Sequence, residues 1–259
     1  FKNCKGSSAE ETVFLLKEEL LRAFLYFQNV VKERLDPASY EYENYQDTLQ
    51  LLKDRKSPSI YLGTCLLNLS RILEACFQKK AVLLIDEYDQ PIISSYEYGY
   101  HQEFSALFST LLGAALKGNS SLDIALLSGI QRVAKESIFS QLNNPKVYTV
   151  MDRRYAPYFG LTVEETQQLL EDYGLALNAD VRRMYDGYRF FETEIYNPWS
   201  ILNYADSGFL DNYWVNTSSN YLIRQALSRA SSGFWRDFDQ LASGQDTTVW
   251  LNLDTSYVE

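Results

Sequence analysis

The stretch that decides the fold runs from residue 81 to residue 89 and reads Ala81-Val82-Leu83-Leu84-Ile85-Asp86-Glu87-Tyr88-Asp89. Its first five residues form a short, unbroken apolar run, which is typical of a strand whose two sheet faces are both covered by helices. Two adjacent acids follow this run. Because open α/β sheets bind their ligands at the carboxyl ends of the strands, the stretch predicts a buried parallel strand that ends in a polar site.

A second apolar run, residues 122–127, has the same character and ends at Ser128-Gly129. Residues 101–117, between the two runs, have a helical pattern. A strand, a helix and a strand at this spacing predict a βαβ unit, and therefore a parallel sheet with a right-handed crossover. Residues 146–150 are a further candidate strand.

The residues before the first strand predict helices. Ser8 and Glu11 fit a capping box, and apolar residues recur behind them at helical spacing, so residues 9–34 are expected to form one long amphipathic helix. Two more helical stretches follow, at about 44–54 and 60–78.

From about residue 159 the pattern becomes helical. Thr162 and Glu165 form another capping box, and Gly174 is placed to end that helix. Asn197, followed by a proline, is expected to start a later helix, which Gly208 would end. A further helix is expected after residue 219. Between the first and second of these helices, one apolar stripe joins Val181, Met184, Tyr185 and Tyr188.

These patterns predict the fold class and the domains. We expect an α/β parallel-sheet core over residues 1–158, a helical lid-like domain over residues 159–245, and a tail over residues 246–259 that leads to a missing C-terminal region. Because the chain starts at Phe1 without a methionine and stops in a polar stretch, both ends are expected to be cuts.

Composition excludes several classes of function. A net charge of −10 argues against a nucleic-acid groove, since binding to phosphates needs clustered Lys and Arg. Three cysteines without a CxxC spacing predict a reduced, cytoplasmic chain. A single histidine makes a zinc site unlikely to form. No apolar run approaches the roughly 18–20 residues of a membrane helix.

The two acids after the first strand suit phosphoryl transfer to water. In that reaction Mg²⁺ must be held against the phosphates and a water must be aimed at phosphorus. An acid at the strand end, here Asp86, can hold the metal, while its neighbour Glu87 orients the water. The alternative is that the acids only mark where a strand reaches solvent. Asp89 either extends this acidic cluster or caps the turn at Pro91.

Several long blocks resemble one family, the predicted AAA-ATPase-like proteins. The first block, residues 84–92, is similar to the Walker B segment of that family. The other blocks follow in the family's order: Ser128-Gly129-Ile130-Gln131-Arg132-Val133-Ala134-Lys135-Glu136-Ser137-Ile138-Phe139-Ser140, Leu142-Asn143-Asn144, Tyr185-Asp186-Gly187-Tyr188-Arg189-Phe190, Tyr196-Asn197-Pro198-Trp199-Ser200, and Tyr213-Trp214-Val215-Asn216-Thr217-Ser218-Ser219-Asn220.

The resemblance implies a P-loop ATPase domain that binds ATP and Mg²⁺, a helical lid-like region and often a C-terminal nuclease-like domain of the PD-(D/E)XK type, in a mostly bacterial family. This chain departs from the pattern in two ways. None of its 12 glycines is followed by Lys, so the phosphate-binding loop is absent from the sequence, and there is no Glu-x-Lys triplet. The segment alone is therefore expected to be inactive.

Two further residues are candidates for contact with the nucleotide. Ser128 ends the second strand, where such ATPases often place a polar sensor of the γ-phosphate, although a small residue there is also an ordinary strand exit. Arg132 either reaches a phosphate of its own or a neighbouring subunit's nucleotide, or pairs with Glu136 one helical turn on. His101 is expected to be a surface or helix-start residue.

The sequence thus predicts part of a Mg²⁺-dependent ATPase that supplies the Walker B and sensor elements. One alternative is a degenerate ATPase that acts as a protein-interaction scaffold. Another is a metal-dependent nuclease that uses Asp86, Glu87 and Asp89. The expected partners are a nucleotide and either further copies or another protein. Nucleic acid is expected only through a missing C-terminal domain, and no membrane is expected.

Overall fold

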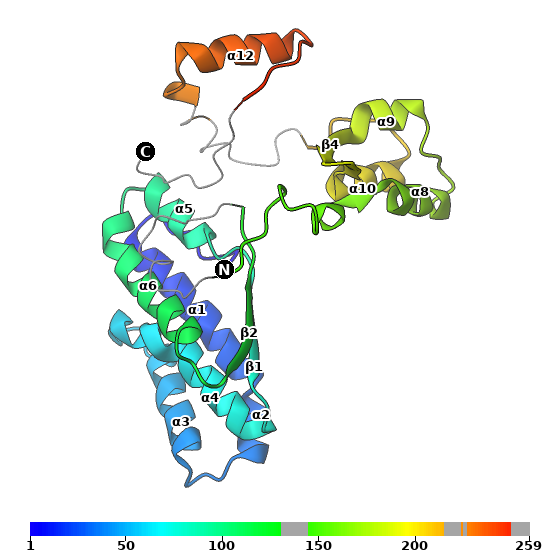
Figure 1. Ribbon diagram of the computed structural model, residues 1–259. Coiled ribbons are helices and arrows are strands. Elements are labelled where there is room, and N and C mark those ends of the chain that lie inside the picture. Colours follow the sequence, from blue (N-terminus) through cyan, green and yellow to red (C-terminus); the bar gives the residue numbers. More distant parts are fainter. Residues whose placement is uncertain (131–144, 215–223, 225–226, 250–259) are drawn as a thin grey trace. The chain divides into compact units, whose positions relative to one another are not determined.

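The computed structural model describes residues 1–130, 145–214, 224 and 227–249 (Figure 1). The chain divides into two compact units. Unit 1 comprises Phe1–Asn144 with Asp239–Glu259, and unit 2 comprises Pro145–Phe238. This division falls earlier in the sequence than the boundary expected at residue 158.

Unit 1 combines helices with a small parallel sheet. Its elements, in chain order, are α1 (Ala9–Tyr26), α2 (Gln28–Arg34), α3 (Tyr40–Lys53), the 3-10 helix η1 (Ser59–Thr64), α4 (Cys65–Phe77), β1 (Ala81–Ile85), α5 (Gln90–Glu97), α6 (His101–Leu116) and β2 (Leu122–Leu127). The predicted α/β class is confirmed at this level.

The first helix is shorter than its apolar pattern predicts. Ser8 caps α1 by accepting a hydrogen bond from the amide of Glu11, as the sequence suggests. The single helix expected over residues 9–34 is wrong, however, because the backbone leaves helical geometry at Phe27 (φ −92°, ψ 4°) and α2 begins at the next residue. The apolar periodicity continues across this break, so the sequence pattern alone does not reveal it.

The core of unit 1 is aromatic and aliphatic. Phe104 and Phe108 are fully buried and stack at a centroid distance of 5.5 Å. Phe24 stacks on Tyr45 at 5.6 Å, and the hydroxyl of Tyr45 donates to the backbone oxygen of Phe24 at 2.7 Å. All three cysteines of the chain are free and buried in this unit.

The two strands of unit 1 pair directly and run parallel. Val82 lies opposite Ile124 and Leu84 opposite Leu126, up to Ile85 opposite Leu127. The parallel βαβ unit predicted from the sequence is therefore confirmed. One helix, α5, was not expected; it fills the chain between the acids and α6.

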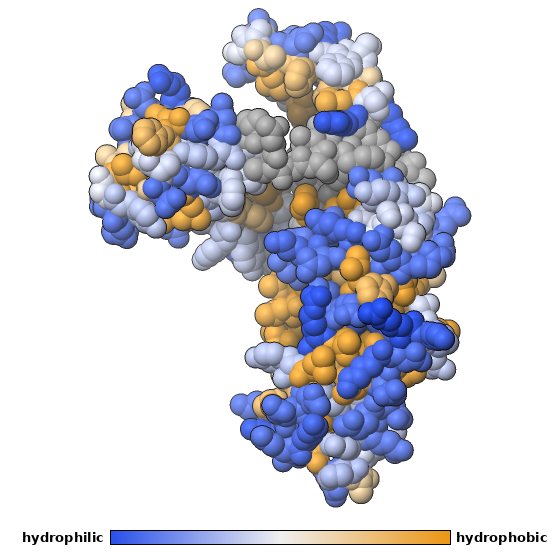
Figure 2. All heavy atoms as spheres, turned by 180° about the vertical axis from the view of Figure 1, so that it is seen from behind, coloured by the Kyte–Doolittle hydropathy of each residue, from blue (hydrophilic) through white to orange (hydrophobic). Residues whose placement is uncertain are grey.

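The helices of unit 1 lie on one side of this sheet, as Figure 1 shows. On the other side four large aliphatic side chains are exposed to between 58% and 69%: Val82, Leu84, Ile124 and Leu126. We call these four residues the bare sheet face. The expectation that helices cover both faces is wrong for the described residues. Apolar side chains reach the surface of both units between hydrophilic neighbours (Figure 2).

One apolar segment of the described residues has the length of a membrane span. It runs from Ser59 to Phe77 through η1 and α4 and has a mean hydropathy of 1.3. Within it Leu66, Leu69 and Ile72 belong to the core cluster of unit 1. The segment therefore packs as the core helix of a soluble protein does.

Unit 2 combines short helices with an antiparallel sheet. Its elements are the 3-10 helix η2 (Ala156–Tyr158), β3 (Leu161–Thr162), α8 (Val163–Asp172), α9 (Ala179–Tyr185), β4 (Asp186–Phe190), β5 (Thr193–Tyr196) and α10 (Pro198–Ser207). The three strands have the order β3-β5-β4. The expectation of a helical lid-like domain is therefore wrong in part, because the described residues of unit 2 include a sheet. Residues 146–150, the further candidate strand, form no strand.

The helix boundaries of unit 2 follow their capping residues. Thr162 and Glu165 form the expected capping box of α8. Asn197 caps α10, and Gly208 ends it with a left-handed backbone (φ 71°). The stripe that was expected to include Tyr188 is wrong, because α9 ends at Tyr185 and Tyr188 lies in β4.

A last helix, α12 (Ser232–Ala242), lies where the chain passes from one unit to the other. None of its side chains is buried. Its aromatic residues pack on one another: Phe234 stacks on Phe238 at 6.1 Å, and Trp235 meets Phe238 edge-on at 5.8 Å.

Candidate functional site

The candidate site lies where β1 and β2 end. Backbone hydrogen bonds continue past both strands: the amide of Ser128 donates to the oxygen of Ile85 at 2.9 Å, and the amide of Tyr88 donates to the oxygen of Ser128 at 3.0 Å. The two chain exits are therefore held side by side. This places Asp86, Glu87 and Ser128 at one edge of the sheet, as the sequence predicts.

Asp86 is exposed and accepts two hydrogen bonds on the same carboxylate oxygen. The hydroxyl of Ser128 donates to Oδ1, and so does the amide of Glu87, at 2.9 Å. The bond from Ser128, followed by that from Glu87, holds the pKa of Asp86 below its ordinary value. Both hydrogen bonds end on Oδ1, and no described residue is shown hydrogen-bonded to the second oxygen, Oδ2.

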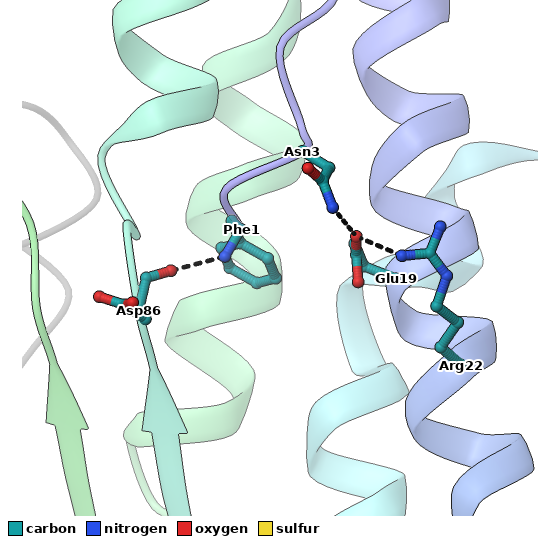
Figure 3. A network of polar contacts seen from close by, with 5 residues as sticks. All are labelled: Phe1, Asn3, Glu19, Arg22 and Asp86. Atoms are coloured by element: carbon teal, nitrogen blue, oxygen red, sulfur yellow. Dashed lines mark hydrogen bonds and ion pairs between the residues drawn. The ribbon is translucent and has the colours of Figure 1, made fainter. Parts of the chain in front are cut away.

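The first residues of the chain also reach this edge (Figure 3). The amino group of Phe1 donates to the backbone oxygen of Asp86 at 2.5 Å, and its ring packs edge-on against Phe108 at 5.8 Å. Nearby, Asn3 donates to Glu19 at 3.2 Å, and Glu19 pairs with Arg22 at 2.8 Å.

Glu87 has a left-handed backbone, with φ of 50°. A non-glycine residue in this region costs about 1–2 kcal/mol. Such strain is often found at functional sites, where the surrounding structure holds it in place. The next residues return to a regular path: the amide of Gln90 donates to the oxygen of Glu87 at 3.2 Å, and α5 begins there.

Asp89 and Tyr88 are buried, with 1% and 6% of their surfaces exposed. Both side chains lie against Gly129, where an added Cβ would come within 2.6 Å of Oδ1 of Asp89 and within 2.8 Å of Cε1 of Tyr88. Asp89 is thus directed at Gly129 and does not join a solvent-facing acidic cluster. Sequence reasoning missed this contact. The one signal for it in the sequence is the glycine directly after the second strand.

The remaining candidates are placed as follows. Arg132 lies outside the described residues, as do most of the second block, residues 142–144 and residues 215–220. His101 is the first residue of α6, as expected; it stacks on Tyr96 at 4.0 Å and contacts Ser95 at 3.1 Å.

The blocks in unit 2 have structural roles. The hydroxyl of Tyr185 donates to the backbone oxygen of Asp211 at 2.9 Å and accepts from the Asp211 amide at 3.0 Å. Tyr196 is fully buried. Asn197 accepts from the amide of Ser200 at 3.1 Å. These are packing and capping contacts.

The described residues contain no group of three or more His, Cys, Asp or Glu side chains that could hold a metal by themselves. A nuclease site built on Asp86, Glu87 and Asp89 would need such a group. A single ionised carboxylate is, in contrast, sufficient where substrate phosphates and water supply the other ligands of Mg²⁺. The donor set around Asp86 fits that second arrangement.

The comparison with known families now decides the resemblance. Residues 14–139 match the family described as AAA-ATPase-like, a predicted AAA-ATPase. Over this segment the chain is similar to that family. The matched segment runs from within α1 through α6 and β2 and includes both exits that form the site. The description as a predicted AAA-ATPase is that of the family.

One curated relative and the solved structures complete the comparison. The chain is 28% identical over 162 residues to "Uncharacterized protein in vnfD 5'region" of Azotobacter chroococcum mcd 1. The alignment covers 62% of this chain but 31% of the relative, so the chain spans less than a third of that protein's length. No solved structure matches the chain. The P-loop form of the core therefore stays a prediction.

Proposed function

We propose that this chain supplies the metal-binding and water-orienting acids of a Mg²⁺-dependent ATPase. One observation carries the proposal: Asp86 and Ser128, from two parallel strands, are hydrogen-bonded to each other at the carboxyl edge of the sheet. Ligands of open α/β sheets bind at this edge. An ionised and exposed carboxylate there suits a divalent cation with bound phosphates.

In this proposal Asp86 would hold Mg²⁺ through its carboxylate, and the ion would neutralise charge on the phosphates of ATP. Ser128 lowers the pKa of the Asp86 carboxyl and fixes its direction through the bond to Oδ1. Ser128 itself stands at the same edge, where a γ-phosphate sensor would have to be. Asp86 and Ser128 therefore contribute to binding and orienting the nucleotide and its metal ion, before the bond to phosphorus breaks.

Glu87 would orient the attacking water and accept its proton. Its left-handed backbone changes the course of the chain directly after Asp86. The oxygen of the water would form a bond to the γ-phosphorus while the bond from that phosphorus to the bridging oxygen breaks, giving ADP and phosphate. A positioned base of this kind contributes about 10²–10⁴-fold.

The test uses a protein that carries this chain together with a phosphate-binding loop. Glu87→Gln should lower ATP hydrolysis by about 100-fold or more and leave ATP binding nearly unchanged. Asp86→Asn should weaken the Mg²⁺-dependent part of ATP binding. Asp123→Asn is the matched control, because Asp123 is an exposed acid near the opposite end of β2. Equal loss of binding in both site variants would contradict the assigned roles.

The scaffold alternative has one supporting observation. The bare sheet face exposes four aliphatic side chains. If the protein is a degenerate ATPase, it should bind no ATP with or without Mg²⁺, and Glu87→Gln should change nothing. Calorimetric titration of ATP into the full-length protein that contains this chain, not into the 259-residue chain alone, distinguishes the two functions directly.

A further inference from the structure

The contact between the two strand exits depends on the absence of a side chain at position 129. A Cβ added to Gly129 would lie 2.6 Å from Oδ1 and 2.7 Å from Cγ of Asp89, and 2.8 Å from a ring carbon of Tyr88. Carbon atoms do not approach other heavy atoms this closely without displacement. The side chains that follow β1 thus occupy the volume that a side chain following β2 would need.

Backbone conformation does not explain this glycine. The glycines with positive φ are residues 99, 118, 174, 208 and 244, and Gly129 is not among them. At those five positions an added Cβ would meet nothing within 4 Å. Gly129 is therefore required for space, whereas those five are suited to their backbone geometry.

Asp89 cannot move aside easily. It is 1% exposed, and its backbone oxygen accepts from the amide of Ile93 at 2.9 Å in the first turn of α5. The Asp89 side chain is short, so the atoms that a Cβ at position 129 would meet, Oδ1 and Cγ, lie close to the backbone of Asp89. Tyr88 is fixed as well, by the bond from its amide to Ser128.

We propose that Asp89 is a positioning residue for the ATPase reaction. Its carboxyl group, seated against Gly129, fixes how closely the exit of β2 approaches the exit of β1. Ser128, the residue before Gly129, is thereby held within hydrogen-bond reach of Asp86. The inference rests on the proposed function for its catalytic meaning, but the packing that it describes can be tested separately.

The experiment enlarges the side chain at position 129, shortens the side chain at position 89, and combines both changes. Gly129→Ala, Asp89→Ala and the double variant are compared in the ATP-hydrolysing protein that carries this chain. Gly129→Ala should lower kcat by about 10- to 100-fold, because a displacement of roughly 1 Å at a reacting group has that effect, while KM for ATP changes little. Asp89→Ala alone should also lower kcat. In the Gly129→Ala background, however, Asp89→Ala should raise kcat in part, because it removes the contacts with Asp89 and leaves the one with the ring of Tyr88.

A second measurement needs no ATPase activity. Amide hydrogen exchange should show that Gly129→Ala reduces the protection of the Ser128 and Tyr88 amides, and that the double variant regains it. Gly187→Ala is the control, since an added Cβ at Gly187 meets nothing within 4 Å and its φ is not positive. It should alter neither exchange nor kcat.

The outcomes separate the two proposals. Loss of protection in Gly129→Ala that Asp89→Ala does not relieve at all would assign the clash to Tyr88 and overturn the role of Asp89, whatever the activity. If protection is regained but kcat per folded molecule never changes, Asp89 is a packing residue and its positioning role is overturned. If the unaltered protein shows no hydrolysis that depends on Glu87, the proposed function itself fails while the packing result stands.

Discussion

The hydroxyl of Ser128 donates a hydrogen bond to the carboxylate of Asp86, 42 residues earlier in the chain. Each residue is the first after its strand, and the two strands are parallel neighbours. One bond thus joins the ends of β1 and β2 and is the largest cause of the lowered pKa of Asp86.

The first prediction concerns the pKa of Asp86. Ser128→Ala removes the larger cause of its lowering, so the pKa should rise toward its ordinary value. A carboxyl group whose pKa is lowered in the folded state stabilises the fold at pH values above its unfolded-state pKa. That stabilisation is lost as pH falls through the folded-state pKa. Ser128→Ala should therefore also reduce the pH dependence of the free energy of unfolding in the acid range. Carbon-13 NMR titration of the Asp86 carboxyl measures the first effect.

Ser128→Thr serves as the control for that prediction, because it keeps the hydroxyl group. Asp86 should titrate in Ser128→Thr as it does in the unaltered chain. An unchanged pKa in Ser128→Ala would show that the amide of Glu87 is sufficient and that the hydroxyl contributes nothing to the acid.

The second prediction concerns backbone strain at Glu87. Glu87→Gly should raise the free energy of unfolding by about 1 kcal/mol. Glycine adopts positive φ without steric cost, and this gain is larger than the loss from the greater freedom of glycine in the unfolded chain. Urea denaturation measures the change. Gln78→Gly is the matched control, since Gln78 has φ of 54° at the end of α4, away from the acids. Both variants should be stabilised, and Glu87→Gly alone should abolish hydrolysis.

The third prediction concerns the chain on its own. The 259-residue chain should hydrolyse ATP negligibly, because the amides and the lysine that cradle phosphates in P-loop enzymes have no counterpart in its sequence. A phosphate-release assay with purified protein measures this. Mg²⁺-dependent turnover that Glu87→Gln removes would contradict the need for a separate phosphate-binding loop.

The fourth prediction compares the two faces of the sheet. Leu84, on the bare sheet face, is 69% exposed, whereas its neighbour Ile85 is 6% exposed. In this chain Leu84→Thr should change the free energy of unfolding by less than about 0.5 kcal/mol. Ile85→Thr should lower it by about 2 kcal/mol or more, because it places a hydroxyl in the core. Similar losses in both would show that the second face is also covered.

The sequence is most informative where a local rule decides the structure. Both strands, the capping box of Thr162 and Glu165, and the left-handed stop at Gly208 were predicted, because each depends on a few adjacent residues. The break at Phe27 and the hairpin of β4 and β5 were not. An apolar stripe continues across the break, and the stripe through Tyr188 keeps helical spacing although α9 ends at Tyr185.

The candidate site was predictable only in part. The shared edge of Asp86 and Ser128 follows from parallel strands, and the structure agrees. The roles of Asp86, Glu87 and Ser128 stay predictions, as does that of Arg132, which lies outside the described residues. The position of Asp89 depends on a three-dimensional contact with Gly129, 40 residues away along the chain, which no local pattern encodes.

That contact has a consequence for how the family can diverge. Because the closest atoms to an added Cβ at position 129 belong to Asp89, a mutation that adds a side chain there is expected to be better tolerated after position 89 has become smaller. Substitutions at the two positions should therefore appear in a fixed order, 89 before 129, along any lineage that retains the fold. A descendant with alanine at 129 should carry glycine or alanine at 89, and such a pair would mark a lineage in which selection on this site has already relaxed.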